Sequence, residues 1–495
     1  ALIPLGVADG LQLLEKLAAG TPLPERLAHA ILDRADGNPF FIEELWQSVL
    51  DAGLTDGAGN SKLDPNVPRT LQGVLQARLD RLGAESKRAL QTASVIGRIF
   101  QDGLLGSMFD PTRAEHLRDW LGDLTARDFI GPCQTSDEDE MLLGDPYAFR
   151  QAITQEVTYG SLLIAERKTL HQRIGEAIEC QCPSRLDELS PVLAYHFDRA
   201  GVASKALTYL IRAARRAARV HALDEALAYY ERAEARALAV DVSAADRLAL
   251  NEGLADLRFR QGQYQTALDH YLVALGSGPN RLQRVALLRK LGQLYEKWGR
   301  YDEALASFHT ALNEMGADLE ETELARIYTG MAMTRYRQGN LDEALELGQL
   351  ALVLSEGRHD EAGIAEACNN LGIIHAKRRD WTAALDHHRR GLEIWGRLGE
   401  PYSEAAAHNN VGLAYHSQGE RETAIEHFRR SLELFERIGN RPGVARAADN
   451  LGRAYMECGD EERGMAYLKD AVAILGEIGM EGSELVPEMW QSGVW

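Results

Sequence analysis

The chain has 495 residues, which corresponds to about three domains of roughly 150 residues each. With 45% hydrophobic and 26% charged residues, its composition is that of a soluble globular protein rather than a fibrous or disordered one. Aspartate and glutamate outnumber lysine and arginine by 74 to 54, and the formal charge of −20 disfavours binding to nucleic acid or to an anionic membrane.

The cellular compartment is predicted from the cysteines and from the chain start. The five cysteines are odd in number and scattered, which favours free thiols in a reducing cytoplasm over a disulfide framework. No basic segment followed by an apolar one opens the chain, and no apolar run approaches the roughly 20 residues of a membrane span. Because the first residue is Ala1 rather than Met, we also expect a processed fragment.

The first part of the chain is predicted to hold two short helices, 8–19 and 23–35, and the motif Ala-Asp-Gly-Asn-Pro-Phe-Phe-Ile-Glu-Glu-Leu begins where the second ends. In this motif Gly37 ends one helix, Asn38 caps the next, and Pro39 takes its first position. The two glutamates lie near the positive end of the helix dipole. Helix-end chemistry alone therefore accounts for the motif, and a functional role stays open.

A winged helix is predicted between residues 68 and 145. It is built from three helices and two strand-like segments, over residues 71–82, 86–96, 113–124, 129–131 and 141–143. DNA binding is a usual role of such a fold. The charges oppose it, because the third helix mixes arginines with acidic residues and four consecutive acids, 137–140, lie at the tip of the wing. Two further helices, 166–181 and 186–200, follow.

The second half of the chain repeats with a period of about 40 residues. Leu-Gly or Val-Gly pairs begin at 371, 411 and 451, and a small residue recurs once per unit, at Ala226, Ala267, Ala304, Ala344, Ala384, Ala424 and Gly464. These positions define seven units, from about residue 205 to about residue 478. Each unit is predicted to be two amphipathic helices joined by a turn, because large apolar residues recur at helical spacing on both sides of a glycine.

These units resemble the tetratricopeptide repeat. The resemblance is carried by Leu291, Gly292, Tyr295, Gly299, Ala304, Phe308 and Ala311, and again by Val411, Gly412, Tyr415, Gly419, Ala424 and Phe428. The usual period of that family is 34 residues, so each helix pair here is longer by about 1.7 turns. The resemblance implies a superhelix whose first helices line a concave groove.

Short polar residues recur on the first helices of three successive units and are the candidate groove residues. With two charged neighbours they form the set Asn369, Asn370, Lys377, Asn409, Asn410, Asp449, Asn450 and Arg453. Asparagine can both donate to and accept from an extended peptide backbone, and in peptide-binding members of the resembled family it does so at this place. Alternatively, these asparagines tie neighbouring helices together or lie in water.

Several histidines in the same region raise the question of a metal site. They are His387, His388, His408, His416 and His427. They fall on different predicted helix faces, and the sequence contains no His-Glu-x-x-His motif. We therefore expect solvated or groove-wall histidines and no metal.

Residues 1–180 resemble the signal-transduction ATPases with numerous domains, which include the ATPase region of many bacterial class III adenylate cyclases, protein kinases and transcription factors. The motif that contains Pro39 resembles their helical lid, and this resemblance implies that Pro39 contacts an adenine ring. Residues 149–162 resemble their winged helix, although Gln151 stands where that family commonly has histidine, so no phosphate-sensing role carries over.

In that family an ATPase core precedes the lid. This chain begins at the lid and contains no Gly-x-x-x-x-Gly-Lys-[Ser/Thr] loop for phosphates. It also shows no nucleophile–base constellation, so we expect no enzyme activity and no cofactor in this chain. ATP or ADP would bind only together with an ATPase core that lies outside it, unless Pro39 retains residual adenine-nucleotide binding.

The expected fold is mainly α, an α-solenoid of about seven tetratricopeptide-like helix pairs preceded by a helical lid and a winged-helix module. The expected domains are the lid at 1–60, the winged helix with its connecting helices at 68–185, the repeat superhelix at 186–480, and a tail at 481–495 with Trp490 and Trp495. We expect this chain to bind a protein or peptide in the groove and to relay binding to the ATPase core. A stand-alone adaptor or scaffold is the alternative, and self-association of the parent protein stays open.

Overall fold

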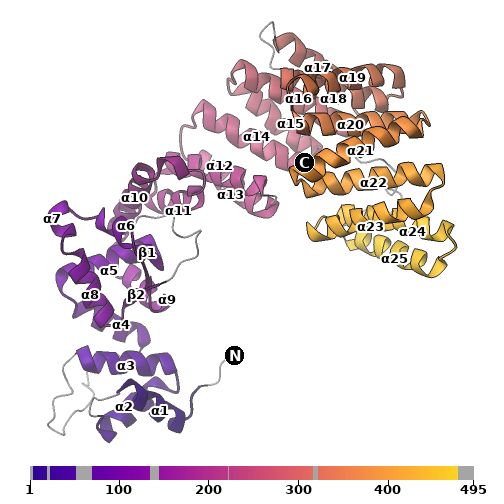
Figure 1. The fold of residues 1–495 in the computed structure, drawn as a ribbon. Coiled ribbons are helices and arrows are strands. Elements are labelled where there is room, and N and C mark those ends of the chain that lie inside the picture. Colours follow the sequence, from indigo (N-terminus) through magenta and orange to yellow (C-terminus); the bar gives the residue numbers. More distant parts are fainter. Residues whose placement is uncertain are drawn as a thin grey trace. The chain divides into compact units, whose positions relative to one another are not determined.

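The computed structural model describes residues 4–18, 23–51, 70–133, 144–220, 222–315 and 321–477. These residues belong to two compact units, 1–242 and 243–495. Helices make up most of both units (Figure 1). Among the described residues, no helix combines the length and the apolar character needed to cross a membrane.

The first unit begins with a cluster of three helices, α1 (Val7–Leu17), α2 (Glu25–Ala35) and α3 (Pro39–Asp51). Their apolar faces meet around Ile31, Ile42 and Trp46, which are fully buried. At the start of α3 the side chain of Asn38 accepts hydrogen bonds from the amides of Phe40 and Phe41, at 3.1 and 3.3 Å. The predicted cap is thereby confirmed, since the orphan amides of the first turn find their acceptor there.

A small sheet with flanking helices follows. Its elements are α4 (Leu71–Asp80), α5 (Ala84–Ile96), β1 (Ile99–Gln101), α6 (Asp102–Gly106), α7 (Pro111–Ala114), α8 (Leu117–Ala126), β2 (Ile130–Pro132), β3 (Pro146–Phe149) and α9 (Ala152–Gly160). The three strands are antiparallel, with β3 in the middle. Phe100, Phe129 and Phe149 are buried between sheet and helices, at 0 to 1% exposure.

One predicted helix of this region differs from the structure, and one predicted strand is not tested by it. The single helix predicted over 113–124 is two helices, because the chain turns between α7 and α8, where the amide of His116 donates to the carbonyl of Arg113 at 3.0 Å. The strand predicted at 141–143 lies outside the described residues. The strand that closes the sheet is β3, which the sequence did not predict because its pairing with β1 is non-local.

The first unit continues with α10 (Ile164–Gln181), a short 3₁₀ turn at Pro183–Arg185, and α11 (Ser190–Ala200). The two helices pack on each other, and the Nδ1 atoms of His171 and His196 meet between them at 2.9 Å. The hydroxyl of Tyr159 lies 3.1 Å from Nε2 of His171. Both histidines are buried, so burial lowers the pKa of His171 to about 4 and that of His196 to about 3.

Seven helix pairs follow in the described part of the chain, and the predicted tetratricopeptide-like solenoid is confirmed. The pairs are α12 (Ala203–Arg219) with α13 (Leu223–Ala237), α14 (Ala244–Arg260) with α15 (Tyr264–Gly276), α16 (Arg281–Lys297) with α17 (Tyr301–Met315), α18 (Glu321–Arg337) with α19 (Leu341–Gly357), α20 (Glu361–Lys377) with α21 (Trp381–Leu398), α22 (Pro401–Gln418) with α23 (Arg421–Arg437), and α24 (Arg441–Glu457) with α25 (Glu461–Glu477). The first pair belongs to the first unit and the other six to the second.

The recurring small residues lie where the two helices of a pair meet. All of them are buried in the structure, namely Ala226, Ala267, Ala304, Ala344, Ala384, Ala424 and Gly464. A Cβ on Gly292 would lie 2.5 Å from the ring of Phe308, and one on Gly412 would lie 2.6 Å from the ring of Phe428. The glycine therefore recurs because a large ring of the second helix occupies the space that its side chain would need.

Candidate binding groove

The short polar residues predicted to line the groove are buried, with exposures of 0 to 5%. They are Asn369, Asn370, Asn409, Asn410, Asp449 and Asn450. Nδ2 of Asn410 donates to Oδ1 of Asn369, and Nδ2 of Asn450 donates to Oδ1 of Asn409, each at 2.8 Å. Each bond joins two neighbouring repeats, as in the alternative that the sequence left open. A peptide could reach these amides only if the repeats moved apart.

The other predicted site residues are more accessible. Lys377, at the end of α20, is exposed. Arg453 has a half-exposed side chain whose Nε lies 2.8 Å from Oδ2 of Asp449, one turn earlier on α24. Pro39 is exposed at the first position of α3. The structure thus pairs Asn369 with Asn410 and Asn409 with Asn450, and we call these two bonds the asparagine ladder. Lys377 and Pro39 lie outside this ladder.

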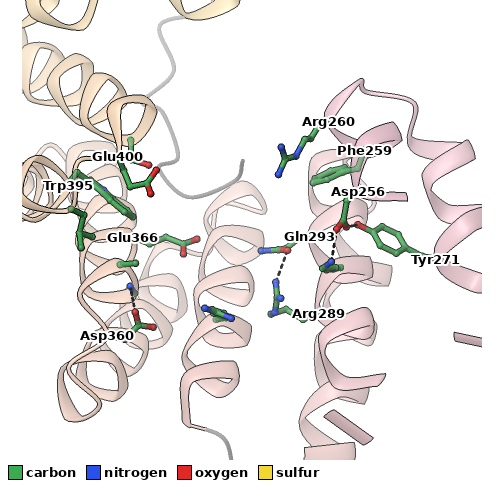
Figure 2. Close-up of a pocket in the computed structure, with 16 residues that line it drawn as sticks. Asp256, Phe259, Arg260, Tyr271, Arg289, Gln293, Asp360, Glu366, Trp395 and Glu400 are labelled. Carbon is green, nitrogen blue, oxygen red and sulfur yellow. Dashed lines mark hydrogen bonds and ion pairs between the residues drawn. The ribbon is translucent and has the colours of Figure 1, made fainter. Parts of the chain in front are cut away.

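A groove of about 550 Å³ crosses the inner helices of the second unit (Figure 2). Its lining comes from α14, α15, α16, α18 and α20, from the end of α21 and from the start of α22, so five successive helix pairs contribute. Four basic and four acidic side chains line it, together with aromatic side chains that include Phe259 and Trp395. A cavity that mixes aromatic walls with charges of both signs suits a polar ligand.

Two groove residues occupy the repeat positions of the buried asparagines. Arg289 and Lys290 precede Asn369 and Asn370 by two repeats, and both line the groove. At α16, the helix face predicted to line the groove does border it. The side chains that reach the groove from this face are the long Arg289 and Lys290 instead of asparagines. The constant offset between repeats was the signal that could have found them, and the sequence prediction did not use it.

Most of the basic side chains in the groove are already paired. Arg289 Nε lies 2.8 Å from Oε2 of Glu323, and Arg326 lies 2.9 Å from Oε1 of the same residue. Burial alone would raise the pKa of Glu323, but the two arginines outweigh it and hold that pKa below its usual value. This triad therefore stays charged and rigid on the groove wall.

Lys290 is held in the same way. Its Nζ lies 2.8 Å from Glu252 and 2.7 Å from Asp256, both on α14. The hydroxyl of Tyr271 also donates to Asp256, at 2.6 Å, and burial together with that carboxylate raises the pKa of Tyr271 well above its usual value. Lys290 thus links α16 to α14 across the repeat boundary.

Three charged groove residues have no ion pair or side-chain hydrogen bond within the described ranges: Arg260, Glu366 and Glu400. Burial raises the pKa of Glu366 to about 7, although Arg289 and Arg326 oppose that rise. The sequence analysis singled out none of the three, because only the spatial neighbourhood shows which charges lack a partner.

The histidines considered as metal ligands in the sequence are buried or partly buried. Nδ1 of His408 lies 2.9 Å from Nδ1 of His427, and burial lowers the pKa of His408 to about 4. His388 is 1% exposed, and neither of its ring nitrogens meets a partner within the described part of the chain. Over the same residues, no three potential ligand side chains come together as a metal site would require.

Residues 246–313, 323–397 and 403–477 match the family model of the tetratricopeptide repeat. The chain carries tetratricopeptide repeats. In fold, it is similar to a signal-transduction ATPase with numerous domains that has a tetratricopeptide repeat sensor, from Pyrococcus horikoshii. That alignment has a TM-score of 0.60 and 13% sequence identity, and it covers 98% of this chain and 71% of the other.

Two further similarities are weaker. An uncharacterized protein of Rhizobium meliloti (strain 1021) is 25% identical over 198 residues, which is 40% of this chain and 19% of that protein. This chain therefore spans only about a fifth of the length of that relative. A Rap protein complexed with competence and sporulation factor aligns with a TM-score of 0.44 and 17% identity, over 55% of this chain and 77% of the other.

Proposed function

We propose that this chain is the sensor part of a signalling ATPase with numerous domains, and that its repeats bind a protein or peptide partner in the groove between α14 and α22. The observation that carries the proposal is that groove itself, because five helix pairs contribute to it and three of its charged side chains lack partners among the described residues. A rigid wall with unpaired charges at fixed places is suited to recognising a complementary ligand.

The first unit would relay that event to an ATPase core outside the chain. We propose the lid at 1–60 and a winged helix with its connecting helices at 68–185, supported by the order α5, β1, α6, α7, α8, β2, β3 and by the antiparallel sheet. Arg78 of α4 supports the relay, since it lies 2.8 Å from Asp51 of α3 and donates to the carbonyl of Arg127 at 2.6 Å. A displacement of α3 would therefore change the contacts of Arg78 with the winged-helix region, and a displacement of that region would change its contacts with α3.

The winged helix is not proposed to bind DNA. Arg113 of α7 lies 3.7 Å from Glu85, and His116, in the turn before α8, lies 3.6 Å from Asp119. Basic side chains in this segment thus face carboxylates, and phosphates would meet mixed charge instead of a positive surface.

A groove-filling variant tests the proposal. Ala362 is exposed at the start of α20 and lines the groove, so Ala362→Trp should fill it without disturbing the core. Ala306→Trp on α17 is the matched control, since Ala306 is also exposed and lies outside the groove. Wild type and control should capture the same protein from an extract of the source cells, and Ala362→Trp should not. Capture by all three proteins would refute the groove as the binding site.

The adaptor alternative differs in its link to nucleotide. A scaffold would bind its partner identically whether or not an ATPase core is joined to it. In the sensor, partner binding should change the nucleotide exchange or hydrolysis of the parent protein, and the Ala362→Trp substitution should abolish that change. Equal ATPase rates with and without the captured partner would favour the scaffold.

A further inference from the structure

We propose that the groove selects a peptide segment with two opposite charges, an acidic side chain that pairs with Arg260 on the α14 wall and a basic side chain that enters between Glu366 and Glu400 on the α20–α22 wall. This inference rests on the proposed function and adds the chemistry of the ligand. It follows from which charges of the groove are satisfied within the protein and which are not.

The α14 wall offers an unpaired guanidinium. Figure 2 shows Arg260 extending into the groove beside Phe259, while Asp256 on the same helix is turned toward Tyr271. Asp256 already accepts from Lys290 and Tyr271, and Arg260 has no partner in the described part of the chain. Guanidinium stays charged at any working pH and binds carboxylates in a two-pronged geometry, so an acidic side chain is its natural ligand.

The opposite wall offers unpaired carboxylates. Figure 2 shows Glu366 of α20 reaching into the groove, with Glu400 and Trp395 on the same wall. Glu366 is half-buried, and a half-buried carboxylate without a donor is unfavourable, because it loses water without gaining a hydrogen bond. A basic side chain from the ligand would supply the missing donor, and its methylene stem would pack against Trp395.

The charges around Glu366 do not substitute for such a ligand. Arg289 and Arg326 both bind Glu323, and they act on Glu366 only through their field. The charged groups that face Glu366 come from every neighbouring helix: Arg289 and Lys297 of α16, Arg326 of α18, Asp360 at the start of α20, and Glu400 before α22. Acids and bases balance here, so a purely anionic ligand such as a nucleic acid gains little.

Binding should depend on pH in a defined direction. Burial raises the pKa of Glu366 to about 7, so its carboxyl is largely neutral at pH 6 and largely ionised at pH 8. An arginine in the ligand keeps its charge throughout. The affinity for an arginine-containing peptide should therefore rise about tenfold from pH 6 to pH 8, in proportion to the ionised fraction of Glu366.

The experiment uses the full chain and synthetic peptides with blocked ends, in which arginine and glutamate are separated by one, two or three Gly-Ser units in either order. Matched peptides carry two arginines, two glutamates or two glutamines. Isothermal titration calorimetry measures each affinity at pH 6 and at pH 8. The mixed-charge peptide of best spacing should bind most tightly, and the glutamine peptide most weakly.

Two variants test which wall of the groove binds which charge of the peptide. Arg260→Met should weaken the mixed peptide by about ten- to a hundredfold and leave the arginine-only peptide unchanged. Glu366→Gln should weaken both arginine-containing peptides and remove the rise with pH. Arg430→Met on α23 and Glu346→Gln on α19 are controls outside the groove, and neither should change any affinity.

The outcomes separate this inference from the proposed function. If no peptide binds more tightly than the glutamine peptide, or if both groove variants bind like wild type, the two-charge selection is wrong. Capture of a partner that Ala362→Trp blocks would then still support the groove as the binding site. If Ala362→Trp also captures the partner, the proposed function fails as well.

Discussion

Nδ2 of Asn410 donates a hydrogen bond of 2.8 Å to Oδ1 of Asn369, which lies 41 residues earlier in the chain, and neither side chain is more than 1% exposed. Asn450 and Asn409 make the same bond one repeat later. A buried amide group is stabilised by a hydrogen-bond partner, and in each of these two bonds the donor comes from the helix of the next repeat, at the position that follows the equivalent residue. The ladder therefore fixes the register of the last three helix pairs.

Removing one rung should destabilise the second unit. Asn410→Ala deletes the donor to Asn369 and leaves its carbonyl oxygen buried without it, so we expect unfolding to become easier by about 1–3 kcal/mol. Urea denaturation followed by circular dichroism measures the change. Lys377→Ala, at an exposed position of the helix that carries Asn369, should stay within about 0.5 kcal/mol of wild type. An Asn410→Ala protein as stable as this control would contradict the ladder.

The positions of the repeats and of their helix-packing residues could be predicted from the sequence. The burial of the asparagines could not. Buried Ala304 and the Gly292–Phe308 contact follow from residue size at fixed spacing, which a single chain displays. Whether Asn369 lies in the groove or beneath it depends on how closely the next repeat packs. A periodic pattern carries no information on that distance.

The N-terminal region shows the same limit. The cap at Asn38 was predictable because a helix end is decided by the residues beside it. The strand β3 was not, because its partner β1 lies far from it in the chain and strand pairing depends on the whole sheet. The unpaired charges Arg260 and Glu366 are non-local in the same sense, since only the three-dimensional arrangement of the described residues shows that each lacks a partner.

Arg78 should be the most sensitive residue of the first unit. It is 1% exposed and pairs with two buried carboxylates, Glu44 and Asp51 of α3, while its guanidinium lies 4.6 Å from the ring centre of Phe129. Arg78→Met leaves Glu44 buried without its cation and leaves Asp51 with only Arg127, at 3.7 Å, which should cost about 3–5 kcal/mol. Hydrogen exchange of the α3 amides should accelerate accordingly.

An exposed ion pair of the same region provides the control for Arg78. Lys87 lies 2.7 Å from Asp80, and both side chains are accessible to solvent. Lys87→Met should leave exchange of α3 unchanged, because exposed pairs contribute little. If Arg78→Met also left α3 exchange unchanged, the proposed coupling between α3 and the sheet module would be wrong.

His388 should be replaceable with a gain in stability. It occupies the repeat position of Phe308 and Phe428. A Cβ on Gly372 would lie 2.5 Å from its ring, as close as a Cβ on Gly292 would lie to the ring of Phe308. Both of its ring nitrogens are buried without a partner in the described residues. His388→Phe removes these polar atoms and keeps the ring, so we expect a gain of about 1–2 kcal/mol.

Calorimetry of the His388→Phe protein measures that gain as a higher melting temperature. Phe428→His is the reverse substitution at the equivalent position of the next repeat, and it should lower the melting temperature by burying the same polar atoms. A decrease for His388→Phe would show that the ring nitrogens contribute to stability.

Acid should destabilise the repeats through the same residue. Burial lowers the pKa of His388 to about 3, so the folded chain keeps this ring neutral while the unfolded chain protonates it below about pH 6.5. Protonation of the unfolded chain at this residue therefore lowers the free energy of unfolding progressively as the pH falls from about 6.5 toward 3, and has little effect well above pH 6.5. From pH 7.5 to pH 5.5 this loss of free energy is about 1.4 kcal/mol. Urea denaturation at the two pH values should show wild type losing that much more stability than His388→Phe. Equal losses in the two proteins would mean that His388 titrates normally in the folded chain.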